Sequence, residues 1–345
     1  MNTDVVQIDP LFPDPPIIAR AAALLRDGRL VAFPTETVYG LGADALNPAA
    51  VAAIFDVKGR PATNPIIVHV ADVASAAELA SAWPAEATDL AARFWPGPLT
   101  IVLPRHPQVP DVVTAGAPTV ALRIPAHRVP HLLITESGRP LAAPSANRSS
   151  RLSPTRASHV LADFIGRIPL LLDGGPTPAG LESTVIDLST RPPRLLRPGP
   201  IPPAAIESLI GPLDRTADET RGRDHPASAA APLPSPGLLP RHYAPRTPLE
   251  CVEGGATPRI SALLDAGRRV GALVFGRAPP SVPVSSRARS MSSDPLEYAG
   301  QLYAALHEMD AAGLDVIVVE LPPNSEAWLA VRDRLRRAAS PAPQT

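Results

Sequence analysis

Cationic, amide and hydroxyl side chains recur in this sequence where predicted strands end and predicted helices begin. They gather in two segments, KGRPATNP with Lys58, Arg60 and Asn64, and PSANRSSRLSPT with Ser145, Asn147 and Ser153. Side chains of these types donate hydrogen bonds, and the two cations also supply the charge that phosphate oxygens attract. Their accumulation at the ends of elements indicates a cleft for a polyanion.

Lys58 is the only lysine of the chain, and the other 31 of its 32 lysine and arginine residues are arginine. Two interpretations are open. Lysine could have been retained at position 58 by chance, at a solvated helix end, since a single charged side chain is usually solvated. Alternatively, a compact ammonium meets a need at this position that a planar guanidinium does not meet, such as a narrow phosphate pocket.

Two arginines interrupt apolar strands, Arg123 in LRIPAH and Arg197 in LLRPGP. A charge inside a buried strand is costly unless it meets a partner, so each could be an edge or ion-paired residue or could face an anionic ligand. Ser183, in GLEST, either belongs to a capped turn or donates to a small ligand. His69 could be a satisfied core histidine, and no second ligand at metal-binding spacing accompanies it.

Residues 48–58 form a well-punctuated predicted helix, with Asn47 as its N-cap, proline in its first turn and Gly59 as its terminator. A second helix is expected to begin at the pair Ser153 and Pro154, where its free N–H groups would suit a phosphate. Strands are expected within residues 29–34, 65–70, 98–104, 119–125, 140–145, 169–175, 183–188 and 194–199.

Several classes of protein are excluded. GLGADA at residues 40–45 matches a dinucleotide fingerprint in letters only, because no strand leads directly into it and no helix opens from it. A Walker A loop and a G-x-S-x-G motif are absent from the sequence. One cysteine, Cys251, rules out a disulfide framework and a cysteine zinc site and fits a reducing cytoplasm. The N-terminus does not look like a signal peptide, and no apolar run reaches membrane-spanning length. A net charge of −1 argues against a general nucleic-acid binder.

The alternation of strands and helices predicts an α/β fold with two domains. We expect a catalytic domain with a mixed sheet over residues 1–210, a linker rich in proline and alanine over 211–248, and a small C-terminal βαβ domain over 249–340.

Taken together, the segments FPTETVYGLGADA, KGRPATNPIIVHV, FWPGPLTIVL, VALRIPAH, PLAAPSAN, DGGPTPAGLESTVIDL and LLRPGP resemble, in order and spacing, the YrdC-type domain of the threonylcarbamoyl-AMP synthase family. HYAP in the linker and the trailing α/β domain resemble the long, two-domain form of that family. The resemblance implies a YrdC-like twisted mixed sheet around a concave cleft, followed by a Rossmann-like domain.

The resemblance also implies an activity. L-threonine, bicarbonate and ATP would condense to threonylcarbamoyl-AMP and pyrophosphate, and a separate tRNA threonylcarbamoyl transferase would accept the adenylate. Threonine would be held by Thr37, His69, Arg123, the Ala143 backbone and Ser183. ATP would be held by Arg60, Asn64, Thr119, Ser145, Asn147, Ser153, Arg197 and Tyr243. Lys58 and Arg60 would act catalytically. Mg²⁺ would arrive on ATP, since the motifs offer little carboxylate for a protein-built cage.

Two interpretations of Tyr243 in the linker segment RHYAP are open. It could be a short anchor that packs the linker onto a domain surface. Alternatively, it would close over bound ATP as part of a lid, because the adenylate is a mixed anhydride that water destroys.

Two other classes of protein share some of these features. A carbamoyltransferase of the hydrogenase-maturation type would need paired-cysteine zinc fingers, which a single cysteine excludes. A double-stranded-RNA-binding module would explain a basic concave face but not the EST segment, the arginines in apolar strands or the C-terminal domain. Weak RNA binding and the oligomeric state stay open.

Overall fold

The computed structural model describes residues 2–215, 233, 235–239, 241–276 and 281–341. The chain divides into two compact units. The first comprises Met1–Ser149, Pro154–Pro178 and Glu182–Leu238, and the second comprises Ser150–Ser153, Ala179–Leu181 and Leu239–Thr345. The domain limits expected from the sequence stay a prediction. None of the helices in the described part of the chain is long and apolar enough to cross a membrane.

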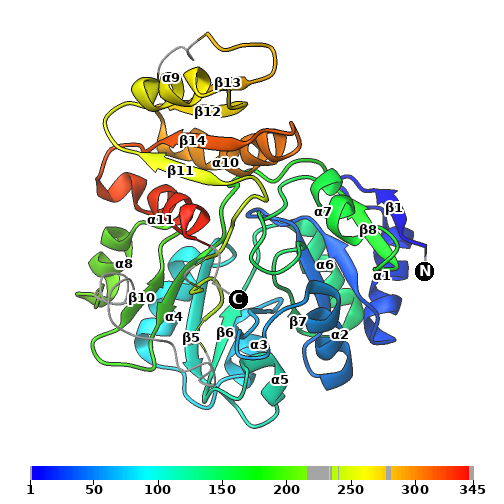
Figure 1. Cartoon of the computed structure of the whole chain (residues 1–345). Helices are drawn as coiled ribbons and strands as arrows, with labels where there is room; N and C mark the ends of the chain where they lie inside the picture. Colours follow the sequence, from blue (N-terminus) through cyan, green and yellow to red (C-terminus); the bar gives the residue numbers. More distant parts are fainter. Residues whose placement is uncertain (1, 216–232, 234, 240, 277–280, 342–345) are drawn as a thin grey trace. The chain divides into compact units, whose positions relative to one another are not determined.

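Within the residues that the structure describes, the first unit contains ten strands and eight helices. Figure 1 traces these elements along the chain. The strands are β1 (Asp4–Gln7), β2 (Val31–Phe33), β3 (Gly40–Asp44), β4 (Val68–His69), β5 (Leu99–Pro104), β6 (Thr119–Arg123), β7 (Leu141–Ala142), β8 (Leu170–Asp173), β9 (Thr184–Asp187) and β10 (Arg194–Arg197). The helices are α1 (Pro15–Arg26), α2 (Pro48–Lys58), α3 (Val73–Glu78), α4 (Ala85–Phe94), α5 (Asp111–Thr114), α6 (Arg128–Ser137), α7 (Ala157–Phe164) and α8 (Pro203–Ile210).

The strands of the first unit form one mixed sheet in the order β1-β8-β2-β3-β7-β4-β6-β5-β9-β10. Helices α1 and α6 bury their apolar stripes against it, with Leu25 and Leu133 packing against Phe33 and Leu172. Burial of such side chains contributes about 1.5–3 kcal/mol each. The mixed α/β fold expected from the sequence is confirmed.

The sequence signals for α2 are confirmed in detail. The Asn47 side chain accepts hydrogen bonds from the backbone N–H groups of Ala49 and Ala50, at 3.1 and 3.2 Å. Gly59 ends the helix at φ 60°, in the left-handed region that glycine adopts without strain. These two caps fix where the helix delivers Lys58.

The glycines of residues 40–45 lie on a strand, β3, which pairs antiparallel with β2. A Cβ on Gly42 would lie 2.5 Å from Cε1 of Phe33, so glycine leaves room there for a buried ring. The exclusion of a dinucleotide fingerprint is therefore confirmed. The sequence analysis missed β3 as a strand, and it also missed β1.

The helix expected at Ser153 is wrong. The helix in this region, α7, begins at Ala157 with Arg156 as its N-cap. The Pro154 carbonyl accepts a hydrogen bond from Tyr39 N–H at 2.8 Å, which holds the preceding chain out of a helix. Ser153 therefore presents no helix N-terminus to a phosphate.

The described residues of the second unit form a four-stranded parallel sheet in the order β11-β14-β12-β13. Its elements are β11 (Leu249–Val252), α9 (Thr257–Asp265), β12 (Val270–Phe275), β13 (Arg287–Met291), α10 (Pro295–Asp310), β14 (Val316–Glu320), η1 (Glu326–Trp328) and α11 (Leu329–Ala339). The expected βαβ architecture is confirmed. The edge strand β13 was not foreseen, because its sequence RARSM alternates weakly and lacks large apolar residues.

Candidate functional site

Lys58 is not at a solvated helix end, because its side chain is only 2% exposed. Its Nζ donates to the backbone carbonyl of Ser145 at 2.6 Å and to that of Asn147. The Lys58 carbonyl in turn accepts from Ser149 N–H at 2.9 Å. The end of α2 is thus joined to the S-x-N loop through both main chain and side chain. Burial, reinforced by the charge of Arg60, lowers the pKa of Lys58 well below its usual value, against the opposite influence of Asp163.

Arg60 and Asn64 form a second buried group in the same segment. Arg60 Nε donates to the Asn64 carbonyl at 2.9 Å, and its Nη2 donates to Asn64 Oδ1 at 2.7 Å and to the Pro65 carbonyl at 2.5 Å. The Asn64 amide oxygen is therefore occupied. Its Nδ2 is buried and has no partner among the described residues. A buried donor without an acceptor is rare in native proteins, so Asn64 Nδ2 indicates a ligand or water position.

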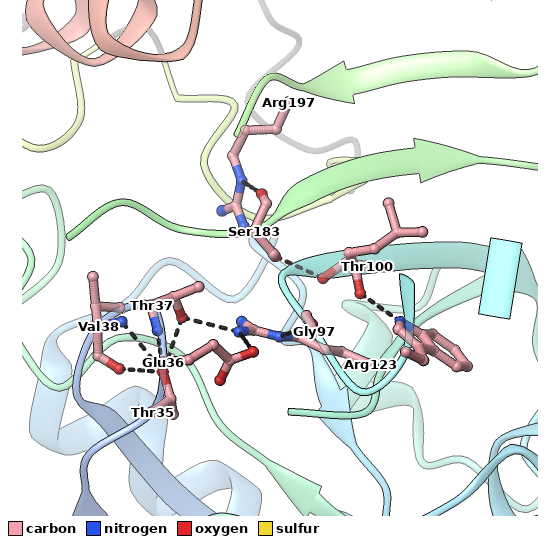
Figure 2. Close-up of polar contacts among 11 residues, drawn as sticks. Thr35, Glu36, Thr37, Val38, Gly97, Thr100, Arg123, Ser183 and Arg197 are labelled. Atoms are coloured by element: carbon pink, nitrogen blue, oxygen red, sulfur yellow. Dashed lines mark hydrogen bonds and ion pairs between the residues drawn. The ribbon is translucent and has the colours of Figure 1, made fainter. Parts of the chain in front are cut away.

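Arg123, at the end of β6, meets an internal carboxylate. Its Nη2 donates to Glu36 Oε1 at 2.6 Å and to Thr37 Oγ1 at 3.1 Å, and its Nε donates to the Gly97 carbonyl at 3.2 Å. Figure 2 shows Arg123 reaching into the loop that carries Thr37. The ion-paired interpretation of this arginine is thus confirmed. Nothing in this pairing tests whether a ligand carboxylate also binds here.

Glu36 was missed by the sequence analysis. Burial is the largest influence on its pKa and acts to raise it, but the Arg123 charge and hydrogen bonds outweigh burial, so the pKa is lowered. Its Oε2 is buried without a hydrogen-bond partner in the part of the chain that the structure describes. An acidic residue inside FPTETVYG was the only signal, and without its distant partner Arg123 that signal is weak.

His69 lies beside Arg123 in the sheet, because β4 and β6 are paired in register at these two residues. Its Nδ1 is buried and unpartnered within the described residues. Burial, and then the charge of Arg123, lowers the pKa of His69 to about 3. A neutral imidazole nitrogen without a partner can accept from or donate to a ligand.

The low pKa of His69 predicts an effect on stability. Between pH 6.5 and about 3 the unfolded chain binds a proton at this histidine that the folded chain does not bind, so the free energy of unfolding falls as pH decreases through that window. The variant His69→Gln should lose this part of the acid sensitivity. Urea unfolding of both proteins at several pH values measures it, and equal pH slopes would contradict it.

Ser183 connects the second arginine to the sheet, as Figure 2 shows. Arg197 Nε donates to the Ser183 carbonyl at 3.0 Å, and its Nη2 donates to Ser183 Oγ at 3.1 Å. The Ser183 hydroxyl also shares a hydrogen bond of 2.7 Å with Thr100 Oγ1 on β5. Thr100 is fully buried and was missed by the sequence analysis. The close approach of Gly199, where a Cβ would lie 2.3 Å from Thr184 N, fixes the backbone at Ser183.

The remaining candidates are dispersed. Thr119 begins β6 and Arg123 ends it, so the two lie roughly 13 Å apart at about 3.3 Å per residue. The Ala143 N–H donates to the Ile67 carbonyl at 3.0 Å. Its role as a threonine ligand stays a prediction, as does that of Thr119 toward ATP.

Tyr243 belongs to the second unit, where it is only 1% exposed. Its ring lies edge-on to His242 at 4.0 Å between centroids, and the Arg334 guanidinium carbon lies 4.8 Å from the ring centre. The next residue, Ala244, donates its N–H to the Ser150 carbonyl at 3.0 Å. This segment is thus tied to residues that follow the S-x-N loop. Contact of Tyr243 with ATP, and its movement as a lid, stay predictions.

The fold and these side chains define an α/β protein with buried arginines, a buried lysine and unpartnered polar atoms near its strand ends. Residues 23–199 match the family model described as "Telomere recombination", of the Sua5, YciO and YrdC proteins. Residues 201–340 match the model described as "Threonylcarbamoyl-AMP synthase, C-terminal domain".

Similar proteins extend over nearly the whole chain. The threonylcarbamoyl-AMP synthase of Pyrococcus abyssi is 45% identical over 92% of this chain and 93% of its own length. That of Bacillus subtilis is 43% identical over 96% and 95%. The crystal structure of P. abyssi Sua5 complexed with L-threonine has a TM-score of 0.89 at 42% identity and covers 97% of both chains. The chain belongs to the threonylcarbamoyl-AMP synthase family.

Proposed function

We propose that this protein condenses L-threonine, bicarbonate and ATP into threonylcarbamoyl-AMP and pyrophosphate, acting as a nucleotidyltransferase. The observation that carries this proposal is the match to named synthases over more than nine-tenths of the chain, at 45% and 43% identity. The fold alone would not assign a reaction. The buried donors at the ends of β6 and β10, Arg123 and Arg197, agree with substrates that carry a carboxylate and phosphates.

We assign threonine to the region around Arg123. Arg123 and Ser183 would take its carboxylate, and Thr37 and His69 would lie beside its polar groups. ATP is assigned to the region of Arg60, Asn64, Ser145, Asn147 and Arg197, with Thr119, Ser153 and Tyr243 as further contacts. The unpartnered Asn64 Nδ2 and His69 Nδ1 support these assignments, because each atom needs a partner that a substrate could supply.

The chemistry needs little proton transfer by the protein at the phosphorus. The threonine amine takes up CO2 from bicarbonate, with loss of water, and becomes an N-carboxylate. A carboxylate oxygen then attacks the α-phosphorus, the new P–O bond forms, and the bond to pyrophosphate breaks. Both reactants are anions, so the main barrier is repulsion. Preorganised donors such as the Arg60 and Arg197 guanidinium groups lower it, and one donor of this kind can be worth about 10²–10³ in rate.

Lys58 contributes through the S-x-N loop. Its ammonium holds the carbonyls of Ser145 and Asn147, which fixes the loop that would face the phosphates. Contact of Lys58 itself with a phosphate, as expected from the sequence, remains a proposal.

Mg²⁺ is proposed to arrive bound to ATP. No three acidic, histidine or cysteine side chains within the described ranges are grouped so as to hold a metal ion. The donor set at the site is cationic and amide, which fits the phosphate oxygens of ATP and not a protein-built cage. Bound to those oxygens, Mg²⁺ would neutralise charge on the leaving pyrophosphate.

We further propose that a separate tRNA threonylcarbamoyl transferase accepts the adenylate in the cytoplasm. The single cysteine agrees with a reducing compartment. Direct contact with RNA would be weak, because the net charge of the chain is −1.

Pyrophosphate release tests the proposal. The full-length protein should release pyrophosphate from ATP only when threonine and bicarbonate are both present. Omission of either substrate should abolish the signal. Release that continues without threonine would mean that a different reaction takes place.

Threonine should be preferred over serine. A pocket that contacts the side-chain methyl loses about 1–3 kcal/mol when that group is missing, or about 10–200-fold in kcat/KM. Pyrophosphate release at subsaturating amino acid, measured with each substrate in turn, gives the ratio. Equal values for serine and threonine would contradict the placement of the amino acid among Thr37, His69 and Ser183.

A further inference from the structure

Two threonines that the sequence did not mark as candidates, Thr35 and Thr100, contact residues of the proposed threonine pocket. Thr100 contacts Ser183, and Thr35 contacts Thr37 (Figure 2). Both supporting residues are buried, at 0% and 3% exposure. The hydroxyl groups of each pair therefore bond to each other away from water. The number of donor and acceptor positions on each hydroxyl limits the direction of these hydrogen bonds.

The Ser183 hydroxyl has limited capacity. It can donate once and accept twice. Arg197 Nη2 can only donate, so it occupies one acceptor position of Ser183 Oγ at 3.1 Å. Thr100 Oγ1, at 2.7 Å, has no other hydrogen-bond partner among the described residues. If Ser183 donated to Thr100, the Thr100 proton would be buried in the strand without an acceptor, which costs about 1–3 kcal/mol.

Ser183 is also 0% exposed, so without a ligand one proton of the pair lacks an acceptor in either arrangement. A ligand at Ser183, the residue assigned to threonine, removes this cost only if Thr100 donates to Ser183. Ser183 then accepts from both Arg197 and Thr100, and its own O–H is left for a ligand. The atom that the ligand presents to Ser183 must be an acceptor. With two arginines in the same region, a carboxylate oxygen fits this position.

The Thr35 hydroxyl has its hydrogen-bonding capacity filled by the backbone. It donates to the Val38 carbonyl at 2.6 Å and accepts from the backbone N–H groups of Thr37 and Val38 at 3.1 and 3.2 Å. The 2.9 Å contact between Thr35 Oγ1 and Thr37 Oγ1 therefore does not fix the direction of the Thr37 proton. The polarity of the site is fixed at Ser183 alone.

We propose that Thr100 is a positioning residue that gives the pocket a fixed polarity, with Ser183 as donor to a carboxylate. This inference rests on the proposed function, since it concerns the site assigned to threonine. It predicts that the ligand presents an acceptor oxygen to Ser183.

Titration calorimetry of L-threonine into the full-length protein tests the positioning role of Thr100. Thr100→Val keeps the shape of the side chain and removes its proton, and should weaken threonine binding by about 2–12-fold, the range of one neutral hydrogen bond. Thr100→Ser keeps the hydroxyl and should bind within about twofold of the parent protein. In a Ser183→Ala background, Thr100→Val should have no further effect, because the threonine acts through that serine.

The possible outcomes distinguish a failure of the positioning role of Thr100 from a failure of the proposed function. Equal losses from Thr100→Val with and without Ser183, or a loss from Thr100→Ser as large as that from Thr100→Val, would overturn the positioning role and indicate packing alone. If Thr100→Val does not fold, the Thr100→Ala variant, alone and in a Ser183→Ala background, tests the same non-additivity. An unaltered protein that does not bind threonine would instead overturn the proposed function, and this inference with it.

Discussion

Lys58→Arg is expected to destabilise the protein and to slow adenylate formation at least about tenfold. A helix end in solvent would accept arginine, but Lys58 is 2% exposed and its ammonium bonds two carbonyls. A guanidinium is longer and wider, and overpacking a filled site costs about 1–3 kcal/mol.

Two comparisons isolate the cause. Lys58→Met keeps most of the volume but leaves both carbonyls without a donor, at about 1–3 kcal/mol each. Arg20→Lys, at an exposed position, serves as the control and should change neither stability nor rate. The readouts are the free energy of unfolding in urea and the pyrophosphate-release rate. If Lys58→Arg matches the unaltered protein in both, a compact ammonium is not required here.

The solitary lysine also permits a direct titration, since selective ¹⁵N-lysine labelling gives one side-chain NMR signal. Its pKa is lowered by burial and by Arg60. Between that lowered pKa and its usual value near 10.5, the unfolded chain binds more protons than the folded chain, so stability from this group rises with pH. Lys58→Met should remove that slope.

Arg123→Met is expected to have the largest effect on stability and to abolish threonine-dependent turnover. Arg123 is 4% exposed, and its partner Glu36 has a side chain that is 14% exposed. Removal of one member of a buried pair leaves an uncompensated charge, which costs about 3–5 kcal/mol. Threonine would also lose the cation assigned to its carboxylate.

A double variant separates these two consequences. Glu36→Gln combined with Arg123→Met should recover much of the lost stability, because no buried charge is left unpaired, but it should recover no activity. The exposed pair of Arg20 and Asp4, joined at 2.5 Å, is the matched control, and Arg20→Met should cost less than about 1 kcal/mol. A double variant as unstable as Arg123→Met alone would show that the ion pair does not determine the loss.

The sequence predicts features that depend on neighbouring residues. The caps of α2 follow from Asn47 and Gly59, which act within a few residues of each other, and the mixed sheet follows from apolar runs between turns. Ser153 shows the limit of such signals. A serine before a proline resembles an N-cap, but the Pro154 carbonyl accepts a hydrogen bond from the distant Tyr39 N–H, and no helix begins there.

Contacts between distant segments could not be predicted in this way. Glu36 and Arg123 are 87 positions apart, and Thr100 and Ser183 are 83 positions apart. Neither Glu36 nor Thr100 carries a local signal that distinguishes it from an ordinary polar residue. Lys58 stood out by composition, but only the fold shows that its partners are backbone carbonyls.

Incorporation of labelled carbon tests directly whether the protein forms threonylcarbamoyl-AMP from bicarbonate. The protein is incubated with ATP, L-threonine and ¹³C-bicarbonate, and the nucleotide product is analysed by mass spectrometry. Threonylcarbamoyl-AMP that carries the label in its carbamoyl group is the expected product, formed together with pyrophosphate. Threonyl-AMP without the labelled carbon, or pyrophosphate released with no threonine-containing nucleotide, would contradict it.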